Sequence, residues 1–223
     1  MEPVEPVPYR ITKDDGTSGP SSKDYTGKAE VVYPNSDTYN GDFKDGVKEG
    51  HGIYNFINGD KYTGDWKNNL QDGIGKTEYA KGGRYYGHYV EGKRSGEGVY
   101  NFINGDIYSG SWRYNQKHGK GTYIVNSCKL EGNNYMKIVG NWENGEILSG
   151  KWIYPNGTYY EGLFEKNLPK GDGSWSFTNR NVNTGEYKHS EARVGNSGEI
   201  STKLTWSPKE EVFDPRIHLI SGK

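Results

Sequence analysis

The chain has 223 residues, of which 31% are hydrophobic, 33 are Gly and 19 are Tyr. This composition excludes an ordinary aliphatic globular core, so aromatic rings are expected to supply most of the buried area. Lys and Arg total 28 against 29 Asp and Glu, giving a formal net charge of −1, which excludes a global field that would attract nucleic acid or anionic lipid.

Residues 1–24 are expected to form an extended leader that is poorly ordered on its own, because they are rich in proline and polar residues. Met1 to Arg10 lack the apolar run of a signal peptide. The longest apolar stretches fall well short of the roughly 20 residues that cross a bilayer. The single cysteine, Cys128, cannot form an internal disulfide. These features predict a cytosolic protein.

A 23-residue period then begins. Gly41, Gly64, Gly87 and Gly110 each sit in the pattern Tyr-x-Gly-x-aromatic, and the steps 64−41, 87−64 and 110−87 are all 23. The signal continues at Gly140, Gly162 and Gly185. The array is predicted over residues 25–188, as a half-repeat followed by about six to seven units. The step from 110 to 140 is 30, so seven extra residues are expected in an inserted loop near 126–137.

The repeat predicts strands with two different faces, because alternate residues of a strand share a face. In the first strand of a unit, Tyr62, Gly64 and Trp66 fall on one side, and the polar Thr63 and Asp65 fall on the other. A glycine between two rings leaves room for a ring from a neighbouring strand. The first strands of the other units repeat this pattern around Gly41, Gly87, Gly110 and Gly162.

The second strand of each unit carries a second column of rings. The dipeptides Asn58-Gly59, Asn104-Gly105 and Asn156-Gly157 are predicted to form two-residue hairpin turns. The other junction, such as Lys67 to Gly73, is expected to be looser. The fold class is therefore all-β: an elongated single-layer antiparallel meander of β-hairpin repeats of about 23 residues.

A single-layer sheet cannot cover both of its faces, so most rings should pack on one another while some stay available to a partner. We expect the second column to include such rings. The candidate partner-binding residues are Tyr54, Phe56, Tyr100, Phe102, Trp152 and Tyr154. Beyond residue 188 the period stops, and residues 189–223 are predicted to be a C-terminal docking tail.

Catalytic and metal chemistry is not indicated. The Gly-x-Gly triplets, such as Gly50-His51-Gly52, lack the third glycine and the helix that would cradle a phosphate. The five histidines are scattered without a Cys or carboxylate at ligand spacing. Cys128 has no evident base. We therefore predict no enzyme, no catalytic residue, no metal ligand and no cofactor.

The pattern Tyr-x-Gly-x-Trp, then Gly-x-Gly-x-Tyr and Asn-Gly-x-x-Tyr, resembles the MORN repeat over roughly Tyr25 to Tyr187. Within that family the chain is similar to the MORN component of ciliary radial spoke heads, in the interrupted unit at Gly140-Asn141-Trp142 and in the segment Leu204 to Pro208. The resemblance implies a structural scaffold in the axoneme of a motile cilium or flagellum, within the cytoskeleton and cytoplasm. Its partners would be other radial spoke head proteins. A homodimer stays open, and nucleic acid or membrane binding is not expected.

Two other functions stay open. MORN arrays are also associated with phosphoinositide or membrane-surface adaptors, but such an adaptor should gather its cations on one surface. Here the cations are interleaved with acids: Lys44, Lys48, Lys67, Lys93 and Arg94 alternate with Asp42, Asp45, Glu49, Asp65 and Glu91. A regulatory module for an attached enzyme would need a catalytic domain in the chain.

Overall fold

The computed structural model describes residues 8–126, 135–194 and 199–209. The described residues form strands, turns and connecting segments without a helix, and no apolar helix long enough to cross a membrane occurs among them. The strands are β1 (Arg10–Lys13), β2 (Ser18–Gly19), β3 (Gly27–Val32), β4 (Thr38–Lys44), β5 (Val47–Asn55), β6 (Lys61–Lys67), β7 (Leu70–Glu78), β8 (Arg84–Val90), β9 (Lys93–Asn101), β10 (Ile107–Arg113), β11 (Gln116–Val125), β12 (Met136–Glu143), β13 (Glu146–Ile153), β14 (Tyr159–Glu165), β15 (Leu168–Ser176), β16 (Val182–Val194) and β17 (Glu199–Pro208).

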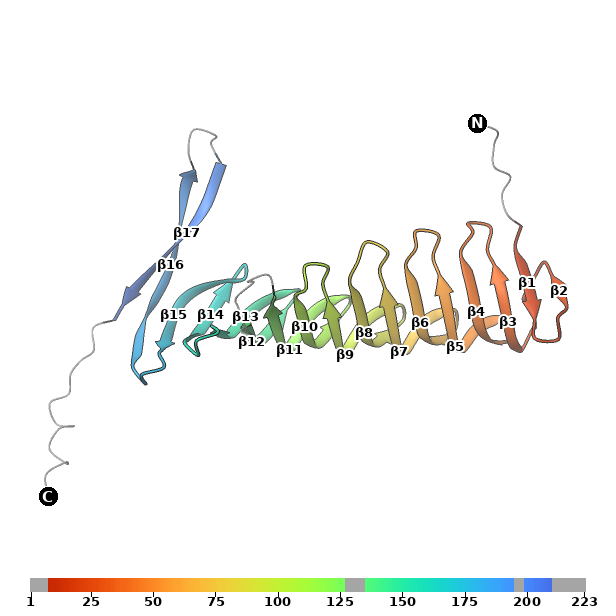
Figure 1. The fold of residues 1–223 in the computed structure, drawn as a ribbon, viewed down its shortest axis with the longest axis horizontal. Coiled ribbons are helices and arrows are strands. Elements are labelled where there is room, and N and C mark those ends of the chain that lie inside the picture. The colour runs from red at the N-terminus through yellow and green to blue at the C-terminus, as the bar shows by residue number, and fades with distance from the viewer. Residues whose placement is uncertain (1–7, 127–134, 195–198, 210–223) are drawn as a thin grey trace, which may run out of the picture.

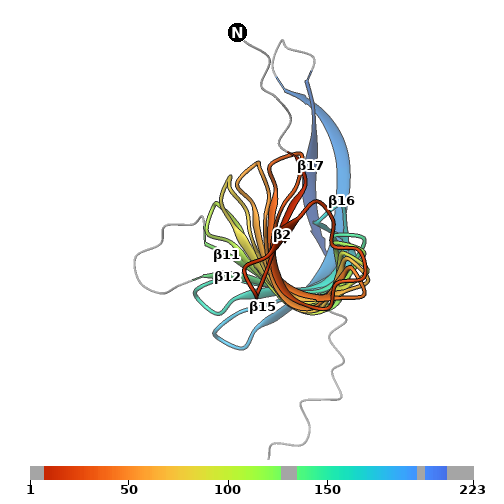
Figure 2. The ribbon, with the colours of Figure 1, turned by 90° about the vertical axis from the view of Figure 1, so that its right-hand side faces the viewer.

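All 17 strands belong to one sheet. Strand β1 pairs with β2 and β3, and from β3 onward each strand pairs antiparallel with the next. The hairpins therefore follow one another along a single axis (Figure 1). Seen from the end, they superimpose as a curved band that is open on one side, so the sheet is a trough (Figure 2). The predicted all-β single-layer meander is confirmed.

The register aligns the repeat glycines in a ladder. Gly41 pairs with Gly52, Gly52 with Gly64, and Gly64 with Gly75. The same pairing continues without a break to Gly173 and Gly185 in β15 and β16. Where these glycines pair, the chains leave no space for a side chain: a Cβ built on Gly64 would lie 2.6 Å from the carbonyl oxygen of Ile74. The ladder is thus the line along which rings can lie across the backbone.

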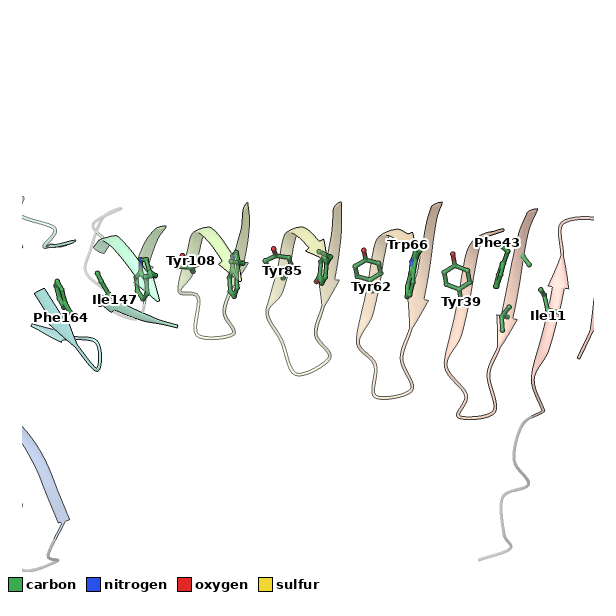
Figure 3. Close-up of a cluster of buried hydrophobic side chains, with 14 of the residues drawn as sticks. Ile11, Tyr39, Phe43, Tyr62, Trp66, Tyr85, Tyr108, Ile147 and Phe164 are labelled. Carbon is green, nitrogen blue, oxygen red and sulfur yellow. The ribbon is translucent and has the colours of Figure 1, made fainter. Parts of the chain in front are cut away.

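The buried core is a row of rings beside this ladder (Figure 3). Within β6, Tyr62 and Trp66 meet edge to face with centroids 5.3 Å apart, and Trp66 meets Tyr39 of β4 in the same way at 5.3 Å. These separations and angles are the favourable ones for aromatic pairs. The row extends to Trp142 through the contacts of Tyr62, Tyr85 and Tyr108 with the next unit. In β12 the position that a tyrosine occupies in the earlier units is occupied by Ile138. A second group of rings packs around Tyr160.

The positions of the tight and loose junctions are the reverse of those predicted. The two-residue turn between β6 and β7 is Asn68-Asn69, where both residues have positive φ, at 48° and 68°. Such paired positive values match the twist of a two-residue hairpin. Asn58-Gly59 instead lies in the longer connection between β5 and β6, where the Asn58 side chain accepts a hydrogen bond from the Asp60 N–H. Asparagine tolerates the left-handed conformation, so glycine was not needed for the tight turn.

Both ends of the array are more ordered than expected. Strands β1 and β2 lie within the segment 1–24 that was predicted to be an extended leader, and Ile11 of β1 is fully buried against the start of the array. The expected docking tail contains β17 and the last six residues of β16. The two strands pair over ten residues. Hydrogen bonding to an existing sheet edge orders both segments. The predicted inserted loop falls largely on 127–134, and the last tail residues on 210–223, outside the described residues.

Candidate functional site

The inner face of the trough carries the second column of rings, and all six candidate partner-binding residues belong to it. Tyr54, Tyr100 and Trp152 lie in β5, β9 and β13, while the others follow the ends of these strands. All six side chains are half-buried. Tyr54 contacts Phe56 with centroids 4.6 Å apart, and Tyr100 contacts Phe102 at 4.5 Å. The structure thus brings the candidates together as neighbouring pairs along one face.

Three cations lie on these rings, and the sequence prediction did not include them. Lys48 places Nζ 4.4 Å from the Trp66 ring centre and 4.7 Å from that of Tyr54. Arg94 places its guanidinium carbon 4.6 Å from Trp112 and 5.3 Å from Tyr100. These distances are those of cation–π contacts. Each cation comes from the second strand of a hairpin and lies between two units.

Lys117 completes the series and has the closest ring contact. Its Nζ lies 4.1 Å from the Trp142 ring centre and 4.9 Å from that of Tyr123. Burial lowers the pKa of Lys117 to about 8. Burial also lowers the pKa of Lys48 to about 8, although the charge of Asp37 acts in the opposite direction. Both lysines are therefore partly removed from water.

A signal for these cations was present in the repeat. Residues 48, 94 and 117 are separated by 46 and 23 residues, that is, by two periods and one. The remaining unit carries Gln71 at this position. From the sequence, Lys48 and Arg94 were counted only among the cations interleaved with acids, because alternation within one strand cannot show that a side chain lies across the next unit.

Two aspartates form hydrogen bonds with rings of the second column. Asp37 accepts hydrogen bonds from the Tyr54 hydroxyl at 2.7 Å and from the Ile57 N–H at 2.7 Å. Asp106 accepts the Tyr123 hydroxyl at 2.8 Å and the Asn126 N–H at 2.8 Å. Both aspartates are buried. Because each anchors a ring and a backbone amide of the following hairpin, the half-buried rings are held in fixed positions.

Around Arg94 and Lys117 the inner face is hollowed. This hollow has a volume of about 370 Å³, and no carboxylate occurs among the described residues that line it. Its lining consists of Arg94, Tyr100, Phe102, Trp112, Asn115, Gln116, Lys117, Tyr123, Asn144 and Gly145. We call it the Arg94–Lys117 hollow. Its chemistry is aromatic and cationic.

The rings of Trp152 and Tyr154 lie further along the same face. They stack with centroids 5.8 Å apart, and Tyr154 contacts Trp175 at 5.8 Å. The position of the cation is taken here by Ile147, which is 1% exposed. No cation–π contact to Trp152, Tyr154 or Trp175 is present among the described residues. This end of the face is apolar.

The described residues contain no group of three or more His, Cys, Asp or Glu side chains placed to hold a metal ion. His51 lies 3.2 Å from the Asp65 carboxylate on the exposed outer face. His189 contacts the carbonyl oxygen of Pro169 at 2.7 Å. His189 also lies 3.9 Å from the Glu165 carboxylate.

Comparison with known proteins matches residues 39–61, 62–84, 85–107 and 108–126 to the MORN repeat. These four matches coincide with the units bounded by Tyr39, Tyr62, Tyr85 and Tyr108. No curated protein sequence matches the chain. Among solved structures, the chain is similar to the SAS-4 (dCPAP) TCP domain of Drosophila melanogaster, solved in complex with a proline-rich motif of Ana2 (dSTIL). The match has 19% identity and a TM-score of 0.45 and covers 78% of this chain and 87% of that one.

Proposed function

We propose that this chain, which carries four MORN repeats over residues 39–126, is a non-catalytic structural scaffold that holds other proteins in an assembly. The observation that carries the proposal is the combination of an unbroken glycine ladder from β4 to β16 with an inner face of half-buried rings. Each hairpin is supported by its neighbours, so the array presents these rings at regular spacing along a stiff axis. Such a surface suits protein contacts, because anchored aromatic residues dominate binding energy at protein interfaces.

The specific assembly that we propose is the radial spoke head of the axoneme in motile cilia or flagella. Its support is the resemblance of the Gly140 unit and of the Leu204 to Pro208 segment to the MORN component of spoke heads. The partners would be the other spoke head proteins, and the location would be the cytoskeleton within the cytoplasm. The protein would contribute to assembly of the spoke, and ciliary motility would depend on it.

Affinity purification tests this proposal. The tagged full chain would be expressed in ciliated cells, isolated from axonemal extracts, and analysed for co-eluting proteins. Recovery of spoke head subunits in stoichiometric amounts is the expected result. Recovery of the chain without any spoke subunit would reject the radial spoke assignment while leaving other assemblies to be identified from the same sample.

A phosphoinositide or membrane-surface adaptor is the competing function. The inner cations lie on rings, within a trough that a flat bilayer cannot follow (Figure 2). The outer cations are interleaved with acids along the sequence. We therefore expect the chain to stay in the supernatant when it is sedimented with anionic liposomes at physiological salt. Salt-sensitive sedimentation with phosphoinositide liposomes would favour the adaptor instead.

A further inference from the structure

Lys117 is a half-buried cation without a polar partner. No hydrogen bond or ion pair to its ammonium group occurs among the described residues. Its surroundings are the rings of Tyr108, Tyr123 and Trp142, with centres 5.7, 4.9 and 4.1 Å from Nζ. A partly desolvated cation gains from an added anion, because the ring faces replace only part of the lost hydration. Lys117 is therefore placed to receive an anion from outside the described chain.

Arg94 supplies a second, fixed donor at the same hollow. Its backbone N–H donates to the Asn115 side-chain oxygen at 2.9 Å, and one terminal nitrogen donates to the Asn115 backbone oxygen at 3.0 Å. Tyr114 and Asn115 form the tight turn between β10 and β11, with φ values of 48° and 69°. The turn thus orients the guanidinium over Trp112. A guanidinium has five N–H groups, so donors remain for a carboxylate.

The Arg94–Lys117 hollow also offers apolar contact. Phe102 is half-buried and bridges the two cation sites, with its ring 4.5 Å from that of Tyr100 and 5.5 Å from that of Tyr123. Asn115, Gln116 and Asn144 provide amide groups at the rim. A ligand that fits must therefore carry an anionic group close to an apolar group.

We propose that the Arg94–Lys117 hollow binds an acidic side chain of an extended segment from a partner protein, with a neighbouring aromatic side chain packing on Phe102. This inference rests on the proposed scaffold function, because its ligand is a protein segment. The charge complementarity is local: two cations line the hollow, and no carboxylate does among the described residues. A protein segment fits better than a lipid head group because the hollow is lined by rings of the inner face, and the sheet that carries them is a trough (Figure 2).

The C-terminal end of the described sheet lies away from the hollow. Pro208 at the end of β17 pairs with Gly185 of β16, which is five strands from β11 and therefore about 24 Å away at 4.8 Å per strand. Strand β17 therefore does not cover the hollow.

The test is direct binding of a probe peptide to the full chain, measured by fluorescence anisotropy. The probe is fluorescein-labelled Gly-Ser-Glu-Phe-Glu-Ser-Gly-amide, and its control has Gln in place of both Glu residues. We expect the Glu probe to bind at least about tenfold more tightly than the Gln probe. Lys117→Met keeps the apolar stem on Trp142 and removes the charge, so it should weaken the Glu probe by about tenfold and leave the Gln probe unchanged. Lys117→Arg keeps the charge and should retain binding.

Lys48→Met is the matched control. Lys48 lies over Trp66 and Tyr54 as Lys117 lies over Trp142 and Tyr123, but it already has the charge of Asp37 beside it. This variant should bind the Glu probe within about twofold of the unchanged chain, because the two sites are independent. Circular dichroism and thermal melts on each variant exclude loss of folding as the cause.

Three results would overturn the inference: equal binding of the Glu and Gln probes, an unchanged affinity in Lys117→Met, or Lys117-dependent binding only of inorganic phosphate or of phosphatidylserine vesicles. Co-precipitation of spoke head subunits by the same variants separates this inference from the scaffold function. If the subunits co-precipitate while the Glu probe fails to bind, the acidic-segment site is wrong and the scaffold function stands. If the Glu probe binds through Lys117 and no subunit co-precipitates, the site stands and the spoke assignment fails.

Discussion

The ring of Tyr39 covers Gly52 of the neighbouring strand so closely that a Cβ on that glycine would overlap the ring. Tyr62 covers Gly75 and Tyr85 covers Gly98 in the same way. The hydroxyl of each tyrosine reaches beyond the glycine ladder and donates to a backbone carbonyl of its own strand, as Tyr39 does to Asp42 at 3.0 Å. The tyrosine and the glycine are therefore one packing unit, repeated along the sheet.

Substituting a ladder glycine should destabilise the array. In Gly64→Val the added Cβ would lie 2.6 Å from the Ile74 carbonyl oxygen and 2.7 Å from the Tyr62 hydroxyl. We expect a loss of about 1–3 kcal/mol in the free energy of unfolding, measured by chemical denaturation. Gly19→Val is the control, because a Cβ there meets no atom within 4 Å. Equal losses in the two variants would contradict the packing role of the ladder.

The hydroxyls of Tyr62 and Tyr160 should contribute differently to stability. The Tyr62 hydroxyl donates to the Asp65 carbonyl oxygen at 2.9 Å, whereas the buried Tyr160 hydroxyl has no partner among the described residues. Tyr62→Phe should cost about 1 kcal/mol, while Tyr160→Phe should be neutral or stabilising, because it removes an unsatisfied polar group. Denaturation midpoints of the two variants, measured side by side, decide this. A larger loss in Tyr160→Phe would disprove it.

Stability should rise between about pH 8 and pH 10 because of the half-buried Lys48 and Lys117. Burial lowers the pKa of Lys48 and Lys117 from 10.5 to about 8 in the folded state, so the unfolded chain binds more protons in this window. Because both lysines are partly exposed to solvent, we expect the free energy of unfolding to increase by only about 1 kcal/mol for each lysine. The ionisable groups facing Lys48 are Asp37, Tyr33, Tyr39 and Tyr54, and those facing Lys117 are Tyr108 and Tyr123.

Above about pH 10 the trend should reverse, because buried tyrosines keep their protons longer in the folded chain. Burial raises the pKa of Tyr33 and Tyr89 to about 12. Denaturation at a series of pH values should therefore give a maximum in the free energy of unfolding. In the double variant Lys48→Met and Lys117→Met the rise between pH 8 and pH 10 should disappear. If the free energy of unfolding of the double variant rises as much as that of the unchanged chain, other ionisable groups cause the rise.

The apolar end of the inner face is the other place where partner binding can be tested. Trp152→Ser or Tyr154→Ser should weaken co-precipitation of spoke head subunits more than it lowers thermal stability, because both rings are half-buried and no cation of the described residues covers them. Phe164→Ser is the control for core damage, since Phe164 is 6% exposed. If Trp152→Ser melts as early as Phe164→Ser and binds normally when folded, the ring belongs to the core.

The sequence determined the repeat, the strand faces and the single-layer class. These depend on local rules: alternation places Tyr62, Gly64 and Trp66 on one face, and a fixed period of 23 residues places the same face in register from unit to unit. The partner-binding candidates Tyr54 and Tyr100 followed from the same alternation. Whether they contact a partner stays a prediction.

Only the tertiary structure decided what lies across the units. The twist and curvature of the sheet bring Lys48 over Trp66 and Lys117 over Trp142, each cation crossing to a ring of the following hairpin. Pairing with an existing sheet edge ordered β1 and β17, whose sequences alone resemble extended tails. The tight turn at Asn68-Asn69 also depended on the observed register, because the asparagine conformation there is selected by the strands that it joins.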